Sequence, residues 1–265
     1  MMRFKLIAKI IIFISLGLFL AGRVFGGTLS YYIHPRFNGL VAATAIGLIL
    51  VGIIYAVQQR RQLLGLSGNH DHDHESDDHG HQHHDHAHPG HSHELGWLGL
   101  GILLIPVVLG VAVEPRPLGA PALSNREVTA GRLTSAQAPG GSSLSFISAD
   151  GERNILDWLY LFQTSENPAE FDGERASVVG FVYRDERFLE SQFMISRFIV
   201  SCCVADAFPV GLIVSWPETS GIPEDQWVEV TGHFEERDFD GFKIPVLVAD
   251  SVIPTEPPPQ PYLYQ

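Results

Sequence analysis

Three long apolar stretches alternate with polar segments in the first half of the chain. Residues 39–57 and residues 95–113 each run for nineteen positions without a charge, and residues 6–21 contain a single charged side chain, that of Lys9. A helix needs about 20 predominantly apolar residues to cross the hydrocarbon core of a bilayer. The pattern therefore predicts three membrane-spanning helices, two within residues 1–57 and one at residues 95–113.

The first apolar stretch also has one feature of a cleaved signal peptide, because Arg3, Lys5 and Lys9 form a basic segment at its start. No clear A-x-A cleavage sequence follows it, and the chain soon enters a second apolar stretch. Both observations favour an uncleaved first helix.

Basic residues near the ends of the predicted helices indicate their orientation, because cytoplasmic segments carry the excess of Lys and Arg. Five basic residues fall on one side and three on the other: Arg3, Lys5, Lys9, Arg60 and Arg61 against Arg23, Arg36 and Arg116. This bias predicts a cytoplasmic N-terminus, a cytoplasmic segment at residues 58–94 and an extracytoplasmic C-terminal domain.

After residue 113 the long apolar stretches give way to short ones. Residues 114–145 are rich in Pro, Gly, Ala and Ser, which predicts a semi-extended linker. Residues 146–254 are enough for one domain, and residues 255–265 form a Pro-rich tail. A short helix and five strands rich in Val, Ile and Phe are expected in the domain. The helix is expected at residues 155–162, and the strands at residues 176–184, 193–203, 210–216, 227–235 and 242–250.

Glycine interrupts the first and the fourth expected strand, at Gly180 and Gly232. Glycine inside a strand commonly marks a bulge or a tight bend, as small barrels require. The predicted fold is therefore a membrane α-helical N-terminal region followed by an all-β domain, a small five-stranded barrel of OB type. Such barrels often bind nucleic acid, but residues 146–265 contain twenty-one Asp and Glu against seven Lys and Arg. This excess repels a phosphate backbone, so we expect no nucleic-acid partner.

Eleven of the thirteen histidines lie between the second and third apolar stretches, mixed with seven carboxylates. They are His70, His72, His74, His79, His81, His83, His84, His86, His88, His91 and His93. Imidazole and carboxylate together favour zinc or its first-row neighbours, and the segment has no apolar periodicity from which to build a core. Residues 58–94 are therefore predicted to form a histidine-rich loop that collects zinc, with nickel and copper as alternatives. An inert spacer is the other interpretation.

The only two cysteines are adjacent, in the segment Ser201-Cys202-Cys203-Val204-Ala205-Asp206. Neighbouring side chains of a strand point to opposite faces, so both thiols reach one ion only if the strand ends there. Three interpretations stay open: a metal site of Cys202, Cys203 and Asp206, packing of two small residues at a barrel corner, or a vicinal disulfide. His233, on the fourth expected strand, is a further candidate ligand.

The segments FDGERASVVGFVYRD, RFIVSCCVADAFPVG and WVEVTGHFEE resemble the C-terminal domain of the YcgQ-type proteins, a family of permease subunits. The resemblance implies N-terminal membrane helices, a multi-spanning permease as partner and a link to zinc-responsive regulation. The family motif falls on Arg197, Cys202, Cys203, Ala205, Asp206 and Ala207.

These observations predict an integral protein of the plasma (inner) membrane, an accessory permease subunit that takes part in handling zinc. Transport by the chain alone is not expected, because its apolar stretches have no ionisable pair or broken-helix pattern that would mark an ion path. We expect no enzymatic activity. The alternatives are a thiol oxidoreductase using Cys202 or Cys203, which lacks the usual C-x-x-C spacing, and a structural anchor that assembles a complex.

Overall fold

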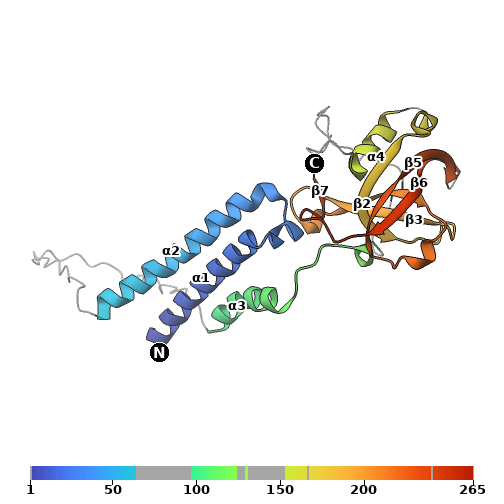
Figure 1. Cartoon of the computed structure of the whole chain (residues 1–265). Helices are drawn as coiled ribbons and strands as arrows, with labels where there is room; N and C mark the ends of the chain where they lie inside the picture. The colour runs from blue at the N-terminus through green and yellow to red at the C-terminus, as the bar shows by residue number, and fades with distance from the viewer. Residues whose placement is uncertain are drawn as a thin grey trace, which may run out of the picture. The chain divides into compact units, whose positions relative to one another are not determined.

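The computed structural model of the chain describes residues 2–63, 97–123, 129–130, 153–165, 167–239 and 241–264. They form two units, one of helices and one of strands (Figure 1). The strand unit also contains residues 27–38, the loop between the first two helices. The eleven clustered histidines, and most of the predicted linker, lie outside the described residues.

The helical unit contains α1 (Met2–Phe25), α2 (Asn38–Leu63) and α3 (Trp97–Ala112). By length and composition, α1 and α2 are candidate membrane spans. The third predicted span corresponds to α3, which has 16 residues and is interrupted by Pro106. Two of the three predicted spans are therefore matched by helices of membrane-spanning length.

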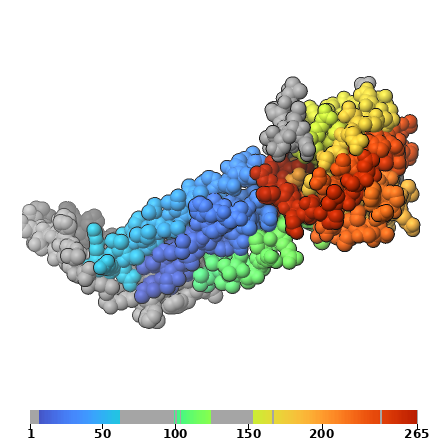
Figure 2. Space-filling view, in the orientation of Figure 1, coloured from blue at the N-terminus to red at the C-terminus, as the bar shows by residue number. Residues whose placement is uncertain are grey.

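Glycines bring α1 and α2 together. A Cβ atom added at Gly17 would meet Ile49 Cγ1 at 2.6 Å, and one added at Gly52 would meet Ile14 Cγ1 at 2.7 Å. Because the earlier residue of α1 meets the later residue of α2, the two helices are antiparallel. Figure 2 shows them side by side, in blue and cyan. Small residues allow this close approach of helix backbones, as they do in membrane bundles.

Five strands of the second unit close into a barrel: β2 (Arg175–Tyr183), β3 (Gln192–Val200), β4 (Phe208–Ser215), β5 (Trp227–Phe239) and β6 (Phe242–Pro254). β2 pairs antiparallel with both β3 and β5, β3 with β4, and β5 with β6. The parallel pairing of β4 with β6 closes the ring. This is the strand order of an OB-type barrel, and it confirms the predicted five-stranded architecture.

The helix α4 (Ile155–Thr164) packs into the core of the barrel. Asn154 begins this helix with a capping box. Its side chain accepts hydrogen bonds from the amides of Leu156 and Asp157, and the Asp157 carboxylate accepts one from the Asn154 amide. The buried Trp158 ring lies 4.7 Å from that of Phe234 on β5. The apolar residues that predicted α4 and the strands therefore contribute to a shared core cluster.

The two glycines within strands have the predicted role. The register of β5 against β6 shifts between Thr231 and Gly232, which is a β-bulge. A Cβ atom at Gly232 would collide with the carbonyl oxygen of Val248, and one at Gly180 would approach that of Ser196 to 2.6 Å. Both positions therefore require glycine for close approach of neighbouring strands.

Two segments outside the predicted barrel domain belong to the same unit as the barrel. Residues 115–123 of the predicted linker pack on the barrel. Ala120 and Leu123 are buried in an apolar cluster with Phe181 and Phe198 of the barrel, and Leu118 packs against it. The predicted tail is also part of this unit, with Tyr262 buried and β7 (Leu263–Tyr264) paired in parallel with β3. Both segments are rich in proline, and for this reason their apolar side chains were not predicted to be part of a core.

Short elements complete the strand unit. They are β1 (Thr129–Ala130), paired in parallel with β4, and the 3-10 helices η1 (Thr28–Tyr31), η2 (Pro35–Phe37), η3 (Ala120–Ala122), η4 (Pro168–Phe171), η5 (Val204–Asp206) and η6 (Thr219–Gly221).

Candidate functional site

The two cysteines lie where β3 turns into β4. β3 ends at Val200, three residues before the predicted end, so Cys202 and Cys203 are in the connection and not in a strand. The constraint that alternate side chains point to opposite faces therefore does not apply to them. The two Sγ atoms and a carboxylate oxygen of Asp206 all lie within 4.8 Å of one another. The structure thus brings together three of the predicted ligands.

Asp206 holds this connection in shape. Its Oδ1 accepts a hydrogen bond from the amide of Ser201 at 3.0 Å. Its Oδ2 accepts hydrogen bonds from the amides of Cys202 at 2.8 Å and Cys203 at 3.2 Å. Burial alone would raise the pKa of this carboxyl, but hydrogen bonds from the Cys202 thiol and the three amides outweigh it and hold the pKa below its ordinary value. Asp206 is therefore ionised at neutral pH.

The thiols are free and accessible. Cys202 is exposed, Cys203 is half-buried, and their Sγ atoms are 3.6 Å apart. This distance exceeds the S–S bond length of about 2.05 Å, so the structure contains the dithiol form. The hydrogen bond to Asp206, and next the one to Cys203, raise the pKa of the Cys202 thiol to about 11. Exposure of Cys202 argues against packing as the reason for the pair.

The loop between α1 and α2 forms one wall of this site. Ile33 forms an antiparallel β-bridge with Cys203. The amide of His34 donates to the Cys202 carbonyl at 2.9 Å, and the Arg36 guanidinium donates to the Ser201 carbonyl at 2.8 Å. Sequence reasoning missed this pairing, because nothing local in residues 27–38 points to a partner so distant in the chain.

His34 is a titratable side chain of this loop that lies near the site. Its Nδ1 accepts the amide of Arg36 at 3.0 Å, and its ring centroid lies 4.5 Å from that of Tyr264. Burial, and next the charge of Arg36, lower the pKa of His34, while the carboxylate of Asp206 opposes them. His34 is not within the group of three mutually close ligand atoms. It therefore borders the candidate site and positions the loop.

Arg197, the first residue of the motif, holds the C-terminal segment. Its guanidinium donates to the carbonyl oxygens of Gln260 at 2.6 Å and Pro261 at 3.0 Å. Burial lowers the pKa of Arg197 to about 10 and raises that of Tyr264 to about 12. Arg197 therefore stabilises β7 beside β3, and it has no ligand role in this geometry.

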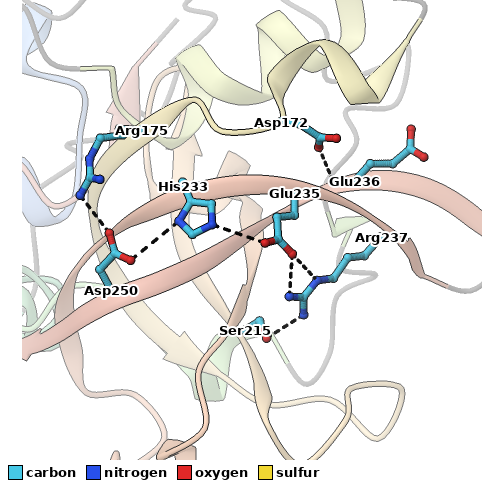
Figure 3. A network of polar contacts seen from close by, with 8 residues as sticks. All are labelled: Asp172, Arg175, Ser215, His233, Glu235, Glu236, Arg237 and Asp250. Atoms are coloured by element: carbon cyan, nitrogen blue, oxygen red, sulfur yellow. Dashed lines mark hydrogen bonds and ion pairs between the residues drawn. The ribbon is translucent and has the colours of Figure 1, made fainter.

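His233 belongs to a different group of polar side chains, on β5 and β6 (Figure 3). Its Nε2 lies 3.4 Å from Glu235 and its Nδ1 lies 3.8 Å from Asp250. Arg175 binds the same Asp250 at 2.9 Å. Among the described residues, the close ligand group contains the two cysteines and Asp206 and does not include His233.

Comparison with known proteins covers both units. Residues 8–129 match the DUF1980 N-terminal domain and residues 152–265 match the DUF1980 C-terminal domain. UPF0703 protein YcgQ of Bacillus subtilis is 29% identical over 112 residues, which are 41% of this chain and 39% of that protein. A Streptococcus mutans protein, named as a candidate subunit of a two-component membrane permease complex, is 25% identical over 202 residues, 62% of this chain and 72% of that protein.

Proposed function

This chain belongs to the DUF1980 family, and on that premise we propose that it is a membrane-anchored accessory subunit of a permease that handles a divalent metal ion. One observation carries the proposal. Residues 27–38, which connect α1 to α2, are part of the same unit as the barrel, and their backbone borders the Cys202–Cys203 site. A barrel tied in this way to a helical hairpin suits a ligand-binding domain held at a membrane surface.

The proposed subunit crosses the membrane three times. In a membrane, the loop at residues 27–38 and the barrel lie on one face, while the far ends of α1 and α2 lie on the other. The chain must then return to reach the barrel, and α3 is the described helix between Leu63 and Pro115. Its 16 residues make about 24 Å of helix, close to the hydrocarbon thickness of about 30 Å.

The proposed orientation places the barrel outside the cytoplasm. Arg3, Lys5, Lys9, Arg60 and Arg61 lie toward the ends of α1 and α2 that the loop at residues 27–38 does not connect. They outnumber Arg23, Arg36 and Arg116, which are expected on the other side. Cytoplasmic segments carry this excess of positive charge. The histidine-rich segment then faces the cytoplasm, opposite the barrel.

The proposed partner is a multi-spanning permease. The Streptococcus mutans relative carries the name of a subunit of a two-component permease complex. The apolar stretches of this chain hold Lys9 as their single charged residue and no carboxylate, so an ion path through these helices would lack a charge pair. The transport path is therefore proposed to lie in the partner.

The proposed cargo is zinc or a similar divalent ion. Eleven clustered histidines on one side of the membrane and a dithiol–carboxylate group on the other supply the nitrogen, sulfur and oxygen ligands that such ions prefer. The thiol oxidoreductase alternative is less well supported. The two cysteines are adjacent and lack the C-x-x-C spacing that is usual for a redox pair.

Copurification tests this role directly. The full chain should be coexpressed with a multi-spanning permease chosen as the candidate partner, and the detergent-solubilised complex isolated through a tag on either chain. We expect both chains in one complex after either purification, and no copurification with an unrelated multi-spanning protein of similar size. Recovery of the chain alone in both purifications would contradict the subunit role.

A further inference from the structure

The geometry points to an open, three-ligand site, formed by Cys202, Cys203 and Asp206, for one thiophilic ion that prefers tetrahedral coordination, of the class of zinc. This inference rests on the metal-handling role proposed above, and it specifies the ligands and the class of ion.

The separation of the two sulfur atoms selects the coordination geometry. The Sγ atoms of Cys202 and Cys203 are 3.6 Å apart. Two sulfurs at this separation, each about 2.3 Å from one zinc ion, subtend an angle of about 103° at the ion, near the tetrahedral value of about 109°. An ion that binds two thiolates in a line would need them about 4.6 Å apart at the same bond length. The pair therefore matches a tetrahedral ion without moving the backbone.

Asp206 can supply the third ligand and keep its structural role. Its Oδ2 accepts two amides, which occupy both lone pairs, while its Oδ1 accepts only the amide of Ser201 among the amides of this connection. The Cys202 thiol also donates to this carboxylate, and because it gives up its proton when it binds a metal ion, a lone pair of Asp206 then becomes available to that ion. The donor set becomes two thiolates and one carboxylate, which suits a borderline-soft divalent ion.

The site is fixed before any ion binds. The bridge from Ile33 to Cys203 and the hydrogen bond from His34 to the Cys202 carbonyl hold the two cysteine backbones from one side. The carboxylate of Asp206 holds their amides from the other. Ligands held in this way lose little conformational freedom on binding, which favours affinity.

Within the part of the chain that the structure describes, the site has three protein ligands, which leaves a fourth coordination position open. Cys202 and Asp206 are exposed and Cys203 is half-buried. Structural zinc sites are closed by four protein ligands, whereas a site with an open position can exchange its ion or pass it to another ligand. Binding forms two metal–sulfur bonds and one metal–oxygen bond, and the two thiol protons leave to water. No electrons are exchanged, so no oxidant or reductant is required.

Cobalt(II) is a suitable probe, because thiolate ligation of this ion gives a charge-transfer absorption band that histidine ligation does not. The full chain, purified in detergent under reducing conditions, should be titrated with Co²⁺. We expect a thiolate band that saturates at one ion per chain and that equimolar Zn²⁺ removes. The double variant Cys202→Ser, Cys203→Ser should lose the band entirely. Asp206→Asn should weaken Co²⁺ binding at the band at least tenfold.

His233→Gln is the matched control, because His233 lies outside the ligand group, and it should leave the band unchanged. Absence of the band in the unmodified chain, or its persistence in the double cysteine variant, would overturn the site. Unchanged affinity in Asp206→Asn would overturn the third ligand. Copurification with the permease separates the two proposals. If the chain copurifies with its partner but gives no thiolate band with Co²⁺, the metal site is wrong and the subunit role still stands.

Discussion

Ile33, in the loop between α1 and α2, forms a β-bridge with Cys203, at the centre of the dithiol–carboxylate group. Hydrogen bonds on both sides extend the pairing, from the His34 amide to the Cys202 carbonyl and from the Val204 amide to the Tyr32 carbonyl, each at 2.9 Å. The backbone of the two cysteines is therefore shaped by a segment from the opposite end of the chain. The reactivity of the thiols should depend on this loop.

Arg36→Ala tests that dependence. The change removes the hydrogen bond from the guanidinium to the Ser201 carbonyl, next to Cys202, in an exposed position. We expect the unfolding free energy to fall by about 0.5–1.5 kcal/mol and the alkylation of Cys202 to become several-fold faster as the connection loosens. Alkylation rates of the full chain, followed by mass spectrometry, measure the effect. The control is Arg60→Ala, in α2, which should leave both the alkylation rate of Cys202 and the unfolding free energy unchanged.

Asp206→Ala should destabilise the connection between β3 and β4. The carboxylate accepts three amides, as the side chain of a helix N-cap does, and alanine leaves those amides to water. Loss of a cap costs about 0.5–2 kcal/mol. Asp206→Asn retains one acceptor oxygen and should cost less. Thermal unfolding of the two variants under the same detergent conditions gives the comparison, and equal melting temperatures for both variants and the unmodified chain would show that the carboxylate has no capping role.

The β-bulge at Gly232 should be intolerant of a side chain. Gly232→Ala places a methyl group against the Val248 carbonyl on the paired strand, so β5 and β6 must separate or the bulge must move. Overpacking of this kind costs about 1–3 kcal/mol. Gly221→Ala is the control, because a Cβ there meets nothing within 4 Å. The unfolding free energies of the two variants, measured with denaturant, should differ by at least about 1 kcal/mol.

Asp185 and Arg187 should give the barrel a pH-dependent contribution to stability. The guanidinium donates to both carboxylate oxygens, at 2.8 and 2.9 Å, and these hydrogen bonds hold the pKa of Asp185 below its ordinary value. A carboxyl whose pKa is lowered in the folded state stabilises above its unfolded pKa, and the effect is lost as the pH falls through the folded pKa. Arg187→Gln should therefore lower the melting temperature at pH 7, with a difference that shrinks below about pH 4. A constant difference across that range would exclude the ion pair as its source.

Local patterns were enough to predict the barrel. Five runs of branched and aromatic residues gave the strands, and Gly180 and Gly232 lie where neighbouring backbones come closest. The grouping of Cys202, Cys203 and Asp206 also has a local origin, because β3 ends at Val200 and the short 3-10 helix Val204–Asp206 turns the chain back toward the cysteines.

Long-range pairing could not be predicted in the same way. Ile33 and Cys203 form their bridge only in the complete fold, and the composition of neither segment predicts which segment it pairs with. The prolines near Leu118 and Tyr262 suggested free segments, yet the Tyr262 hydroxyl accepts the Leu118 amide at 2.9 Å and donates to the Tyr31 carbonyl at 3.2 Å. A few apolar side chains between prolines are therefore sufficient to dock a segment on an existing core.

The pairing of the loop with the barrel has a direct consequence for membrane topology. Single cysteines at Tyr32 and Ser191, both exposed, should react with an impermeant reagent added outside intact cells, since one belongs to the loop and the other to the barrel. A cysteine at Gln58, near the far end of α2, should be protected until the cells are opened. The background is the chain with Cys202→Ser and Cys203→Ser, which removes both native thiols. If Tyr32→Cys and Gln58→Cys label from the same side, α2 does not cross the membrane. If Tyr32→Cys and Ser191→Cys label from opposite sides, the loop cannot be paired with the barrel in the cell.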